Sequence, residues 1–520
     1  MSCFAAPVAQ RAGVAAAPKT RRGASSARVA APPRRRSAQP RVSVVPAAKD
    51  DFAPETDLEL SDLTAISPVD GRYGGKVQIL RACFSEYALV RARVIVEVRW
   101  LQRLAAIPEI TEVPPLSADA NAFLEKFLDE FSPADAAEVK KVERTTNHDV
   151  KAVEYVIKDR LVQHPELAGV MEFVHFACTS EDINNLGYAL TIRDALEKVW
   201  LPSVKLLLEK LRGLSQETAA TPMLSRTHGQ PATPTTLGKE LAVFVFRLQR
   251  QLSRIDGQAF LGKFSGATGT YAAHLVAAPD VDWPEQSKGF VESLGLTHNP
   301  LTTQIESHDW QAELYQKMGH VNRILHNFAT DIWSYISINY FKQIPVKGAT
   351  GSSTMPHKIN PIRFENAEAN LEMSLAILDS LASTLVTSRL QRDLTDSSAQ
   401  RNIGVGFGHS LLAIDNLTKG LDELAVNEAA LLTDLLENWE VLGEAIQSAI
   451  RADVARGESE IKDPYALLKE LTRGKRITDE DLKAFVDGLD ISEATKERLL
   501  VLKPQTYLGL AAELAKLVAN

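Results

Sequence analysis

The sequence predicts an all-α protein in which long helices between roughly residues 170 and 420 pack as a bundle. In four stretches apolar residues recur at steps of three and four, which places them on one stripe of a helix. The stripes are Trp200, Val204, Leu207, Leu211 and Leu214; Leu237, Leu241, Phe244, Leu248 and Leu252; Leu371, Leu375, Leu378, Leu381 and Leu385; and Leu432, Leu436, Trp439, Leu442 and Ile446. Alternating β-branched runs between hairpin turns are nearly absent. We therefore expect these stripes to form the core of a helical bundle.

Helix starts can be located at two places. Ser132 offers an N-cap, Pro133 the first helical residue and Asp135 an acid in the first turn, and Thr478 precedes Asp481 with the same spacing. We expect a helix to begin at each place.

Breaks in the pattern suggest the domain organisation. Glycines and prolines interrupt residues 262–300, where we expect an irregular segment across one end of the bundle. The predicted parts are a basic, disordered segment at 1–49, an N-terminal helical domain at 50–168, a central helical bundle at 169–421 and a C-terminal helical domain at 422–520.

The first 49 residues differ in charge from the rest of the chain. They hold eight Arg, two Lys and no acid, a charge of +10, which leaves −18 for residues 50–520 because the net charge is −8. Pro7, Arg11 and Pro18 interrupt the apolar segment that a secretory signal needs, so an organelle transit peptide is favoured. Further prolines and the Arg34–Arg36 cluster disfavour a regular amphipathic helix, which favours a plastid over a mitochondrion. A disordered basic arm for nucleic acid or a membrane surface is the alternative.

The composition predicts a large core and two to four domains, since the chain has 520 residues, a mass of 57.0 kDa and 45% hydrophobic residues. No window holds eighteen consecutive apolar residues, so we expect no membrane span. Cys3, Cys83 and Cys178 are too few for a disulfide framework or a zinc cluster, and a reducing compartment is the simplest expectation.

A polar loop is predicted at Gly351–Pro361, with the sequence Gly-Ser-Ser-Thr-Met-Pro-His-Lys-Ile-Asn-Pro. No apolar period of 3.6 or 2 residues runs through it, whereas good helix formers resume at Phe364. Polar loops between long helices are common places for catalysis.

Three common motif classes are disfavoured. Gly348–Ser353 lacks the Gly-Lys-Ser/Thr ending of a phosphate loop. The glycines of Gly404–Gly408 are not a dinucleotide-binding fingerprint, because no βαβ pattern surrounds them. The eleven histidines include no His-Glu-x-x-His, which disfavours a zinc hydrolase.

Four further polar clusters interrupt the helical pattern. They are Ser67–Tyr73, Thr145–Asp149, Thr179–Asn185 and Ser225–Pro231. Singly, each is equally well explained by capping and turn chemistry, since Asp149 or Ser180 could cap a helix. Their occurrence together with the polar loop indicates a shared functional site.

The loop Gly351–Pro361 resembles the signature loop of the fumarase/aspartase superfamily, whose members eliminate fumarate from succinyl-type substrates. Within that superfamily, four segments resemble the adenylosuccinate lyase family in the form found in many bacteria: Thr146–Glu154, Thr179–Asp182, Thr227–Pro234 and Arg389–Ser397. The resemblance extends from about Leu60 to the C-terminus. It implies a three-domain fold whose central bundle assembles into the core of a homotetramer, with three subunits building each active site.

The activity implied by the resemblance is β-elimination of fumarate in purine biosynthesis, from adenylosuccinate to give AMP and from succinylaminoimidazole carboxamide ribotide to give AICAR. It implies Ser352 as general base, His228 as general acid, Glu365 as the residue that orients His228, and His148 in an assisting role. A serine is a poor base unless its alkoxide is stabilised, which backbone N–H groups of a glycine-flanked loop and Lys358 could do. No metal or organic cofactor is implied.

The resemblance also implies which residues contact the substrate. That substrate carries two carboxylates and a phosphate, so an acidic protein needs local cationic side chains to bind it. Lys358 and Asn360 are expected at the succinyl carboxylates. Arg392, Ser397 and Arg401 are expected at the phosphate, where the run from Thr395 also predicts a helix start that favours an anion. The remaining expected contacts are Arg72, Tyr73, Asn147, His148, Asp149, Thr179, Ser180, Gln304, Ser353 and Asn366. A surface ion pair is the alternative for each arginine.

Two alternatives to this function stay open. A sister enzyme such as argininosuccinate lyase shares the signature loop, but a substrate without phosphate would not need the arginine-rich region 389–401. A non-catalytic structural protein could use the same scaffold, although the presence of Ser352, His228 and Lys358 argues against it. We expect no nucleic-acid or membrane partner.

Overall fold

The computed structural model describes residues 58–345, 348, 354–355, 357–472 and 476–519. The chain separates into two units, Met1–Leu58 and Glu59–Asn520, and the second is described by itself. The predicted transit segment 1–49 lies outside the described residues. Within those residues, none of the helices has the length and apolar character needed to cross a lipid bilayer.

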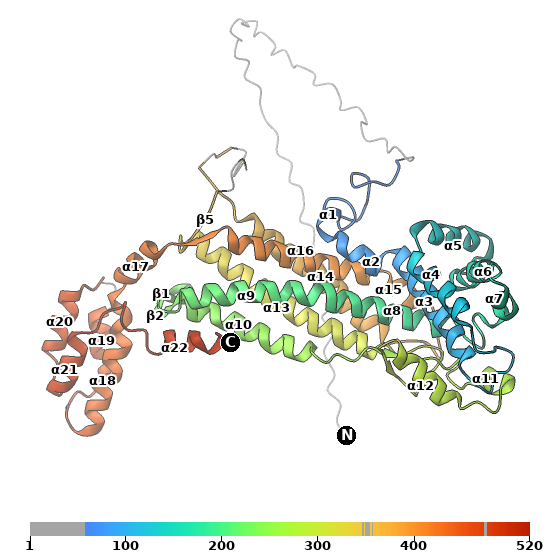
Figure 1. Cartoon of the computed structure of the whole chain (residues 1–520). Coiled ribbons are helices and arrows are strands. Elements are labelled where there is room, and N and C mark those ends of the chain that lie inside the picture. Colours follow the sequence, from blue (N-terminus) through green and yellow to red (C-terminus); the bar gives the residue numbers. More distant parts are fainter. Residues whose placement is uncertain (1–57, 346–347, 349–353, 356, 473–475, 520) are drawn as a thin grey trace, which may run out of the picture. The chain divides into compact units, whose positions relative to one another are not determined.

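The unit begins with a group of helices of 4 to 20 residues (Figure 1). These are α1 Gly74–Val77, the 3-10 turn η1 Gln78–Leu80, α2 Arg81–Phe84, α3 Glu86–Ala105, α4 Ala118–Glu130, α5 Pro133–Thr146, α6 Asp149–Leu161, α7 Pro165–Val170 and the 3-10 turn η2 Met171–Phe173. The predicted start of α5 is confirmed, because the Asp135 N–H donates to Ser132 Oγ at 3.4 Å and the Ser132 N–H donates to Asp135 Oδ2 at 2.9 Å. This reciprocal pair satisfies two N–H groups that the first turn would otherwise leave without partners.

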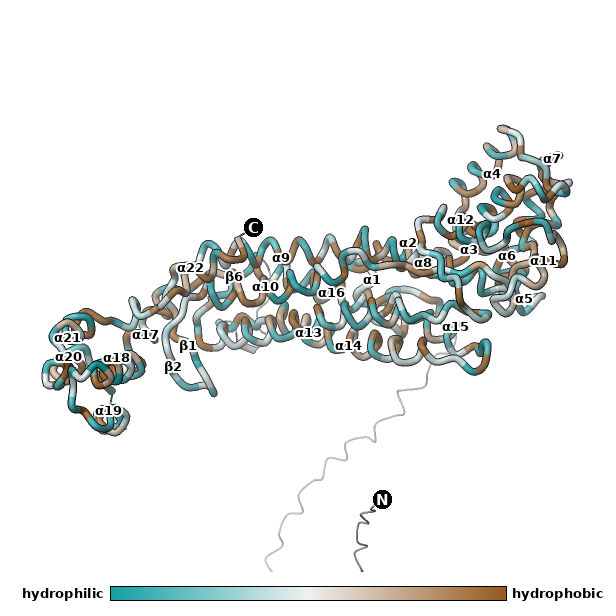
Figure 2. Tube along the Cα trace, turned by 90° about the horizontal axis from the view of Figure 1, so that it is seen from below, coloured by the Kyte–Doolittle hydropathy of each residue, from teal (hydrophilic) through white to brown (hydrophobic). Residues whose placement is uncertain are grey.

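Long helices form the predicted bundle. They are the continuous run of α8 Ser180–Ala195, the π-helical turn η3 Leu196–Trp200 and α9 Leu201–Glu217, followed by α10 Leu237–Ile255, α13 Asp309–Ser337, α14 Ile362–Leu385 and α16 Ile403–Asp422. Helix α14 packs between α13 and α16, and α9 packs against α10 and α16. Figure 2 shows hydrophobic and hydrophilic residues alternating along these helices, as expected of helices with one buried face. The first three predicted stripes are buried or half-buried, and the helical fold class is confirmed.

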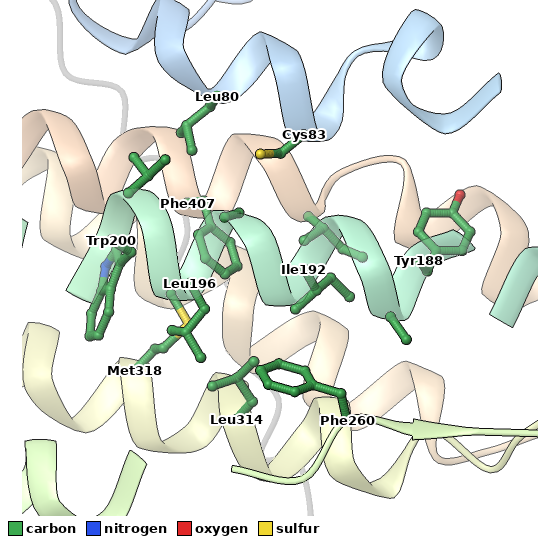
Figure 3. Close-up of a cluster of buried hydrophobic side chains, with 14 of the residues drawn as sticks. Leu80, Cys83, Tyr188, Ile192, Leu196, Trp200, Phe260, Leu314, Met318 and Phe407 are labelled. Carbon is green, nitrogen blue, oxygen red and sulfur yellow. The ribbon is translucent and has the colours of Figure 1, made fainter. Parts of the chain in front are cut away.

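The centre of the bundle combines apolar packing with one chain of buried hydrogen bonds. Figure 3 shows Trp200 and Met318 among the apolar side chains of this core. Trp200 Nε1 donates to Ser410 Oγ at 2.9 Å, and that hydroxyl donates to Asn322 Oδ1 at 2.8 Å. Asn322 Nδ2 in turn donates to Ser374 Oγ at 3.0 Å. Because these buried polar groups satisfy one another, they favour a single arrangement of η3, α13, α14 and α16.

Strands are few and short in the described part of the chain. Strand β1 Pro222–Thr227 pairs antiparallel with β2 Gln230–Thr236, β3 Leu261–Gly262 pairs parallel with β4 Thr297–His298, and β5 Phe341–Gln343 pairs antiparallel with β6 Leu424–Val426. The segment predicted to be irregular, 262–300, contains two helices, α11 Ala272–Ala277 and α12 Trp283–Ser293.

The C-terminal part has a second hydrophobic cluster. Its elements are α17 Glu428–Leu436, the 3-10 turn η4 Trp439–Leu442, α18 Gly443–Arg456, α19 Pro464–Thr472, α20 Asp479–Asp487, α21 Glu493–Leu500, α22 Ala511–Ala515 and the 3-10 turn η5 Lys516–Val518. Leu442, Ile446 and Ile450 are fully buried in this cluster. Thr478 Oγ1 accepts from the Asp481 N–H at 3.2 Å, so the second predicted helix start is also confirmed. The domain boundaries at 168 and 421 remain predictions.

The fourth predicted stripe is wrong at its beginning. Leu432 and Leu436 are 42% and 37% exposed, whereas their neighbours Leu431 and Leu435 are fully buried. Helix α17 ends at Leu436 and a 3-10 turn follows, so one 3.6-residue period does not continue through Trp439. The stripe joined residues of two elements as if they shared one helix.

A buried histidine predicts a pH-dependent stability. His274 is fully buried, and neither ring nitrogen has a hydrogen-bond partner among the described residues. Its ring lies 4.8 Å from that of Trp283, centroid to centroid. Burial lowers the pKa of His274 to about 4, whereas Asp182 and Lys263 act in opposite directions. The folded state therefore binds this proton less readily than the unfolded state, and the free energy of unfolding should fall as pH drops from about 6.5 to about 4.

The contribution of His274 can be measured against His274→Phe, which keeps an aromatic ring in the same apolar surroundings. Between pH 6.5 and 4.5 the wild type should lose up to about 1.4 kcal/mol of stability per pH unit more than the variant. Thermal unfolding across this range measures the difference. Parallel pH profiles for the two proteins would contradict the expectation.

Candidate active site

A first group of predicted site residues lies where α5, α6 and α8 meet. Asn147 ends α5 in the left-handed conformation, with φ 50°, and turns the chain toward α6. His148 caps α6, since its Nδ1 accepts from the Lys151 N–H at 3.1 Å. Its other ring nitrogen lies 3.5 Å from Ser180 Oγ. The structure thus brings together His148 and Ser180, and the His148 ring is about half exposed, 52%, and accessible to a ligand.

The start of α8 is fixed by a buried ion pair. Asp182 Oδ2 accepts from the Thr179 N–H at 2.8 Å, and Asp182 Oδ1 accepts from the Ser265 N–H at 2.9 Å. Lys263 Nζ lies 2.7 Å from Asp182 Oδ1, and both side chains are fully buried. Loss of either partner alone would leave a buried charge uncompensated, which costs about 3–5 kcal/mol. Thr179 and Ser180 are therefore held rigidly against the segment after β3.

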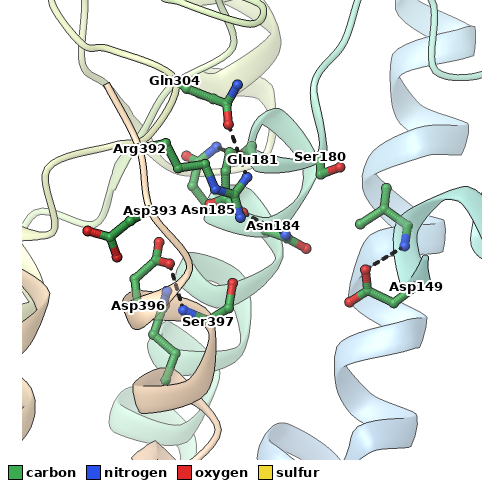
Figure 4. A network of polar contacts seen from close by, with 12 residues as sticks. Asp149, Ser180, Glu181, Asn184, Asn185, Gln304, Arg392, Asp393, Asp396 and Ser397 are labelled. Atoms are coloured by element: carbon green, nitrogen blue, oxygen red, sulfur yellow. Dashed lines mark hydrogen bonds and ion pairs between the residues drawn. The ribbon is translucent and has the colours of Figure 1, made fainter. Parts of the chain in front are cut away.

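The two predicted phosphate-binding arginines belong to this first group, and Figure 4 shows Arg392 beside Glu181 and Gln304. Arg392 lies 2.9 Å from Glu181 Oε1 through Nη2 and donates from Nη1 to Gln304 Oε1 at 3.3 Å. Arg401 Nη2 lies 3.7 Å from Asp149 Oδ2, and its Nη1 donates to the Ser397 carbonyl at 2.9 Å.

Helix α15, Thr395–Gln400, lies between these two arginines and begins at Thr395 as predicted. Arg392, Arg401 and Ser397 are thus gathered at one place. Each arginine also makes an ion pair. That of Arg401 lies at the surface, as in the alternative, whereas that of Arg392 with Glu181 is largely buried.

Three buried residues join this group together and were given no role from the sequence, although two of them, Glu181 and Asn184, lie in the polar cluster Thr179–Asn185. Arg93 on α3, 2% exposed, donates from Nη2 to Asp149 Oδ2 at 2.7 Å and from Nε to Asn184 Oδ1 at 2.9 Å. Asn184 Nδ2 donates to Glu181 Oε1 at 2.7 Å, so a continuous chain of contacts runs from Arg401 to Arg392. Helix α3 also carries Arg91, Arg99 and Arg103, so no local pattern singled out Arg93.

The surrounding arginines and N–H groups favour the ionised form of Asp149. Burial raises the pKa of Asp149, but the charge of Arg93, the hydrogen bonds from Val150 N–H and Arg93, and the charge of Arg401 outweigh it. The pKa of Asp149 therefore lies below its usual value, and the carboxylate keeps both arginines in place.

A second group lies around the beginning of α14. Asn366 Nδ2 donates to the Tyr73 hydroxyl at 3.3 Å, and the Arg72 guanidinium lies 6.0 Å from the centroid of the Tyr73 ring. Lys358 is exposed and Asn360 half-buried. The described residues of the signature loop, 354–355 and 357–361, form neither helix nor strand, as predicted. Ser352 and Ser353 lie outside the described residues.

His228 is at the tip of a β-hairpin that the sequence analysis did not predict. Strands β1 and β2 pair from Pro222↔Thr236 to Thr227↔Gln230, which leaves His228 and Gly229 as a two-residue turn. Both have positive φ, 54° and 73°, as a type I′ turn requires. The sequence signal for this turn was Gly229, which follows His228 and stands between two segments that contain Thr and Pro. The turn leaves the His228 side chain exposed.

The predicted pairing of His228 with Glu365 is not formed within one chain. Among the described residues, the Glu365 carboxylate instead accepts from Trp333 Nε1 at 3.1 Å. The pairing remains a prediction for an assembly of chains.

The start of α8 and the hairpin β1–β2 lie at opposite ends of the helical run α8–α9 (Figure 1). Ser180 begins α8, and the hairpin follows the end of α9 at Glu217. The run Ser180–Glu217 has a length of about 55 Å at 1.5 Å per residue. The eleven residues from Glu217 to His228 span at most about 37 Å even when fully extended, so the hairpin cannot return His228 to Ser180. One chain therefore cannot place both side chains on one small molecule.

Two cavities adjoin the first group at Arg401. One is lined by Val69, Asp70, Val77, Leu80, Arg81, Phe84, Ser85, Arg401, Gly404 and Val405, and the other by Cys83, Phe84, Ser85, Glu86, Leu89, Tyr188, Thr191, Gln400, Arg401 and Gly404. Neither contains another residue of the predicted site. In the described part of the chain, no group of three or more His, Cys, Asp or Glu side chains is arranged to hold a metal ion.

Comparison with known proteins identifies the family. The family model described as Lyase matches residues 71–373, and the model described as Adenylosuccinate lyase C-terminal matches residues 388–508. Adenylosuccinate lyase of Escherichia coli K12 is 52% identical over 454 residues, which are 87% of this chain and 98% of that protein. That of Haemophilus influenzae is 51% identical over 459 residues, 88% of this chain and 99% of the relative.

Solved structures with lower sequence identity share the fold. A fumarate lyase from Mesorhizobium sp. BNC1 has a TM-score of 0.68 at 19% identity and covers 85% of this chain and 97% of its own. The 3-carboxy-cis,cis-muconate lactonizing enzyme from Pseudomonas putida has a TM-score of 0.66 at 21% identity, covering 85% of this chain and 96% of its own. The chain therefore shares the fold of these two proteins. Together with the family models and the close relatives, this places the chain in the adenylosuccinate lyase family.

Proposed function

We propose that the chain catalyses the β-elimination of fumarate from adenylosuccinate, giving AMP, and from succinylaminoimidazole carboxamide ribotide, giving AICAR, in purine biosynthesis. The observation that carries the proposal is the first group of site residues. It gathers Arg392 and Arg401, suited to a phosphate, with the hydrogen-bonding side chains of His148 and Ser180. The relatives that match nearly their full length are adenylosuccinate lyases, and they give no support to a sister lyase or a structural protein.

The elimination breaks a C–H bond and a C–N bond. It needs a base for the proton on carbon and an acid for the departing nitrogen. Ser352, as an alkoxide, removes the proton from the succinyl carbon next to the C–N bond. The electron pair left on that carbon forms the double bond of fumarate as the C–N bond breaks. His228 donates a proton to the departing nitrogen. Lys358 and Asn360 bind the succinyl carboxylates and stabilise the negative charge that develops there.

The remaining residues bind and orient the nucleotide. Arg392, Ser397 and Arg401 bind the phosphate, because guanidinium groups form charge-assisted hydrogen bonds with phosphate oxygens. Glu365 orients His228, and His148 assists at the succinyl group. The other contacts are assigned to Arg72, Tyr73, Asn147, Asp149, Thr179, Ser180, Gln304, Ser353 and Asn366.

The substrate assignment is tested by a spectrophotometric assay of the purified protein without residues 1–49. We expect a loss of the adenylosuccinate absorbance with formation of equal amounts of AMP and fumarate, and no turnover of argininosuccinate. Turnover of argininosuccinate alone would assign the chain to the sister lyase, and turnover of neither would favour the structural role.

We also propose that the protein is a homotetramer with shared active sites. Two observations support it: His228 and Ser180 of one chain are too far apart for one substrate, and apolar side chains are exposed on the bundle helices. The exposed residues include Leu206 on α9, Val243 and Phe246 on α10, Trp333 on α13 and Met373 on α14. Light scattering should give about four times the mass of one chain. A monomer at assay concentration would contradict the proposal.

Residues 1–49 are proposed to direct import into a plastid. Their charge of +10 and their lack of acids support this. A fluorescent protein fused after residues 1–55 should accumulate in plastids of plant cells. Cytosolic fluorescence would overturn the proposal, and mitochondrial fluorescence would overturn the choice of organelle.

A further inference from the structure

The hairpin that carries His228 is attached to the C-terminal part of the chain by an apolar contact. Leu224 on β1 is 1% exposed and packs with Leu435 of α17 and Val441 of η4 in a separate hydrophobic cluster. The pairing register is irregular between Met223 and Ser225, on either side of this leucine. This irregularity is a β-bulge, which changes the direction of a side chain on the strand. Here it lies at Leu224, the residue that contacts α17.

Polar contacts to the same helix lie nearer the turn. Arg226 Nη2 donates to Asp434 Oδ2 at 2.5 Å, and the Tyr340 hydroxyl donates to the same oxygen. The side chains of Arg226 and Asp434 are 30% and 25% exposed. Burial and the hydrogen bond to Asp434 raise the pKa of Tyr340, so its hydroxyl keeps the proton that it donates.

Asp434 is itself held in place on α17. Asn438 Nδ2 donates to the Asp434 main-chain carbonyl at 2.6 Å. On the second strand, Thr233 Oγ1 donates to Glu444 Oε2 of α18 at 2.5 Å. Both strands of the hairpin are therefore bonded to C-terminal helices, about 200 residues further along the chain.

The side chain of His228 has no such support of its own. Among the described residues, it makes no hydrogen bond or ion pair within the chain, and it is exposed at the turn two residues beyond Arg226. Within one chain, the position of this side chain is consequently set by the hairpin backbone, which must present His228 to Glu365 and the substrate in the assembly. We propose that Asp434 is a positioning residue for His228: by holding Arg226 and Tyr340 together, it fixes the hairpin at the angle from which His228 reaches the substrate. This inference rests on the proposed function, in which His228 is the general acid.

The proposal predicts a particular kinetic effect of Asp434→Asn. The amide has nearly the same shape but lacks the charge that binds Arg226, so the hairpin should tilt. A displacement of about 1 Å of a catalytic group can cost about 100-fold in rate, and we expect kcat to fall roughly 10- to 100-fold. The KM for adenylosuccinate should change less than about threefold, because the phosphate and succinyl contacts belong to other elements. Tyr340→Phe, which removes one of the two donors, should lower kcat in the same direction by less.

A double-mutant cycle with His228 separates positioning from a general structural effect. In a His228→Asn background the acid is already absent, so adding Asp434→Asn should reduce the residual turnover less than about twofold. The matched control is Glu125→Gln, which removes a similarly exposed ion pair with Arg99 that joins α3 and α4, far from the hairpin along the chain. The control should keep the wild-type kcat and show a thermal midpoint like that of Asp434→Asn.

Hydrogen exchange provides a readout that does not depend on activity. Mass spectrometry of Asp434→Asn should show faster amide exchange in peptides covering residues 222–236 and unchanged exchange in α14.

Wild-type kcat in Asp434→Asn, an equal loss with and without His228, or wild-type exchange in the hairpin would each overturn the proposal. If the wild type did not cleave adenylosuccinate, the proposed function would fail. The exchange measurement would then decide whether Asp434 holds the hairpin.

Discussion

Replacing Ser352 with alanine is expected to reduce kcat for adenylosuccinate by at least about 10²–10⁴-fold, the usual contribution of a positioned proton transfer. Ser352 is the proposed base, and no other side chain of Gly351–Pro361 is proposed to remove the proton. The substitution removes one hydroxyl from a polar loop, so the thermal midpoint should change little. Steady-state kinetics and thermal unfolding monitored by circular dichroism measure the two effects.

The control for this prediction is Ser253→Ala. Ser253 is an exposed serine on α10 whose hydroxyl donates to the Arg250 carbonyl at 3.0 Å, outside the proposed site. It should retain wild-type kcat. An active Ser352→Ala enzyme would remove Ser352 from the mechanism, and a wild type as inactive as the variant would favour the structural role.

Replacing His228 with asparagine is expected to lower kcat by a similar factor, about 10²–10⁴-fold. Asparagine is the appropriate substitution because His228 has a φ of 54°, and asparagine tolerates the left-handed conformation better than most residues. It therefore preserves the turn while removing the group that can donate a proton at neutral pH. The same kinetic and thermal measurements apply.

A His228→Asn enzyme that keeps more than about a tenth of the wild-type kcat would contradict the role of His228 as the acid, because the loss would lie far below the usual contribution of such a group. A loss of activity accompanied by a lower thermal midpoint would indicate a disturbed hairpin instead. Exchange in residues 222–236 distinguishes these results.

The long helices could be predicted from the sequence because burial of one face imposes a repeat of 3.6 residues. Trp200, Leu207 and Leu211 are fully buried as that repeat required. The same reasoning failed at Leu432, because a helix end and a 3-10 turn lie between residues that the repeat had joined. The hairpin was missed because β1 and β2 are short and contain polar residues and prolines, so no alternation of apolar residues marks them.

The identities of the site residues could be predicted only through the resemblance of their motifs to a family. Their arrangement could not. The chain of contacts through Arg93 and Asn184 joins three helices, α3, α6 and α8, and depends on distances that no local pattern encodes. The attachment of the hairpin to Asp434 spans about 200 residues and was likewise invisible in the sequence.

The separation of the site residues within one chain leads to the central claim that each active site combines groups from different chains. It is tested by mixing two inactive variants. One is His228→Asn, changed at the hairpin, and the other is Arg392→Ala, changed in the first group at the opposite end of the bundle. Co-expression with two affinity tags allows purification of assemblies that contain both.

Such assemblies should regain activity, because some sites combine an intact hairpin from one chain with an intact first group from another. Assemblies of His148→Gln with Arg392→Ala serve as the control, since both changes lie in the first group, and they should remain inactive. Recovery in the first mixture without recovery in the control is the predicted result. No recovery in either mixture, or equal recovery in both, would contradict a site shared in this way.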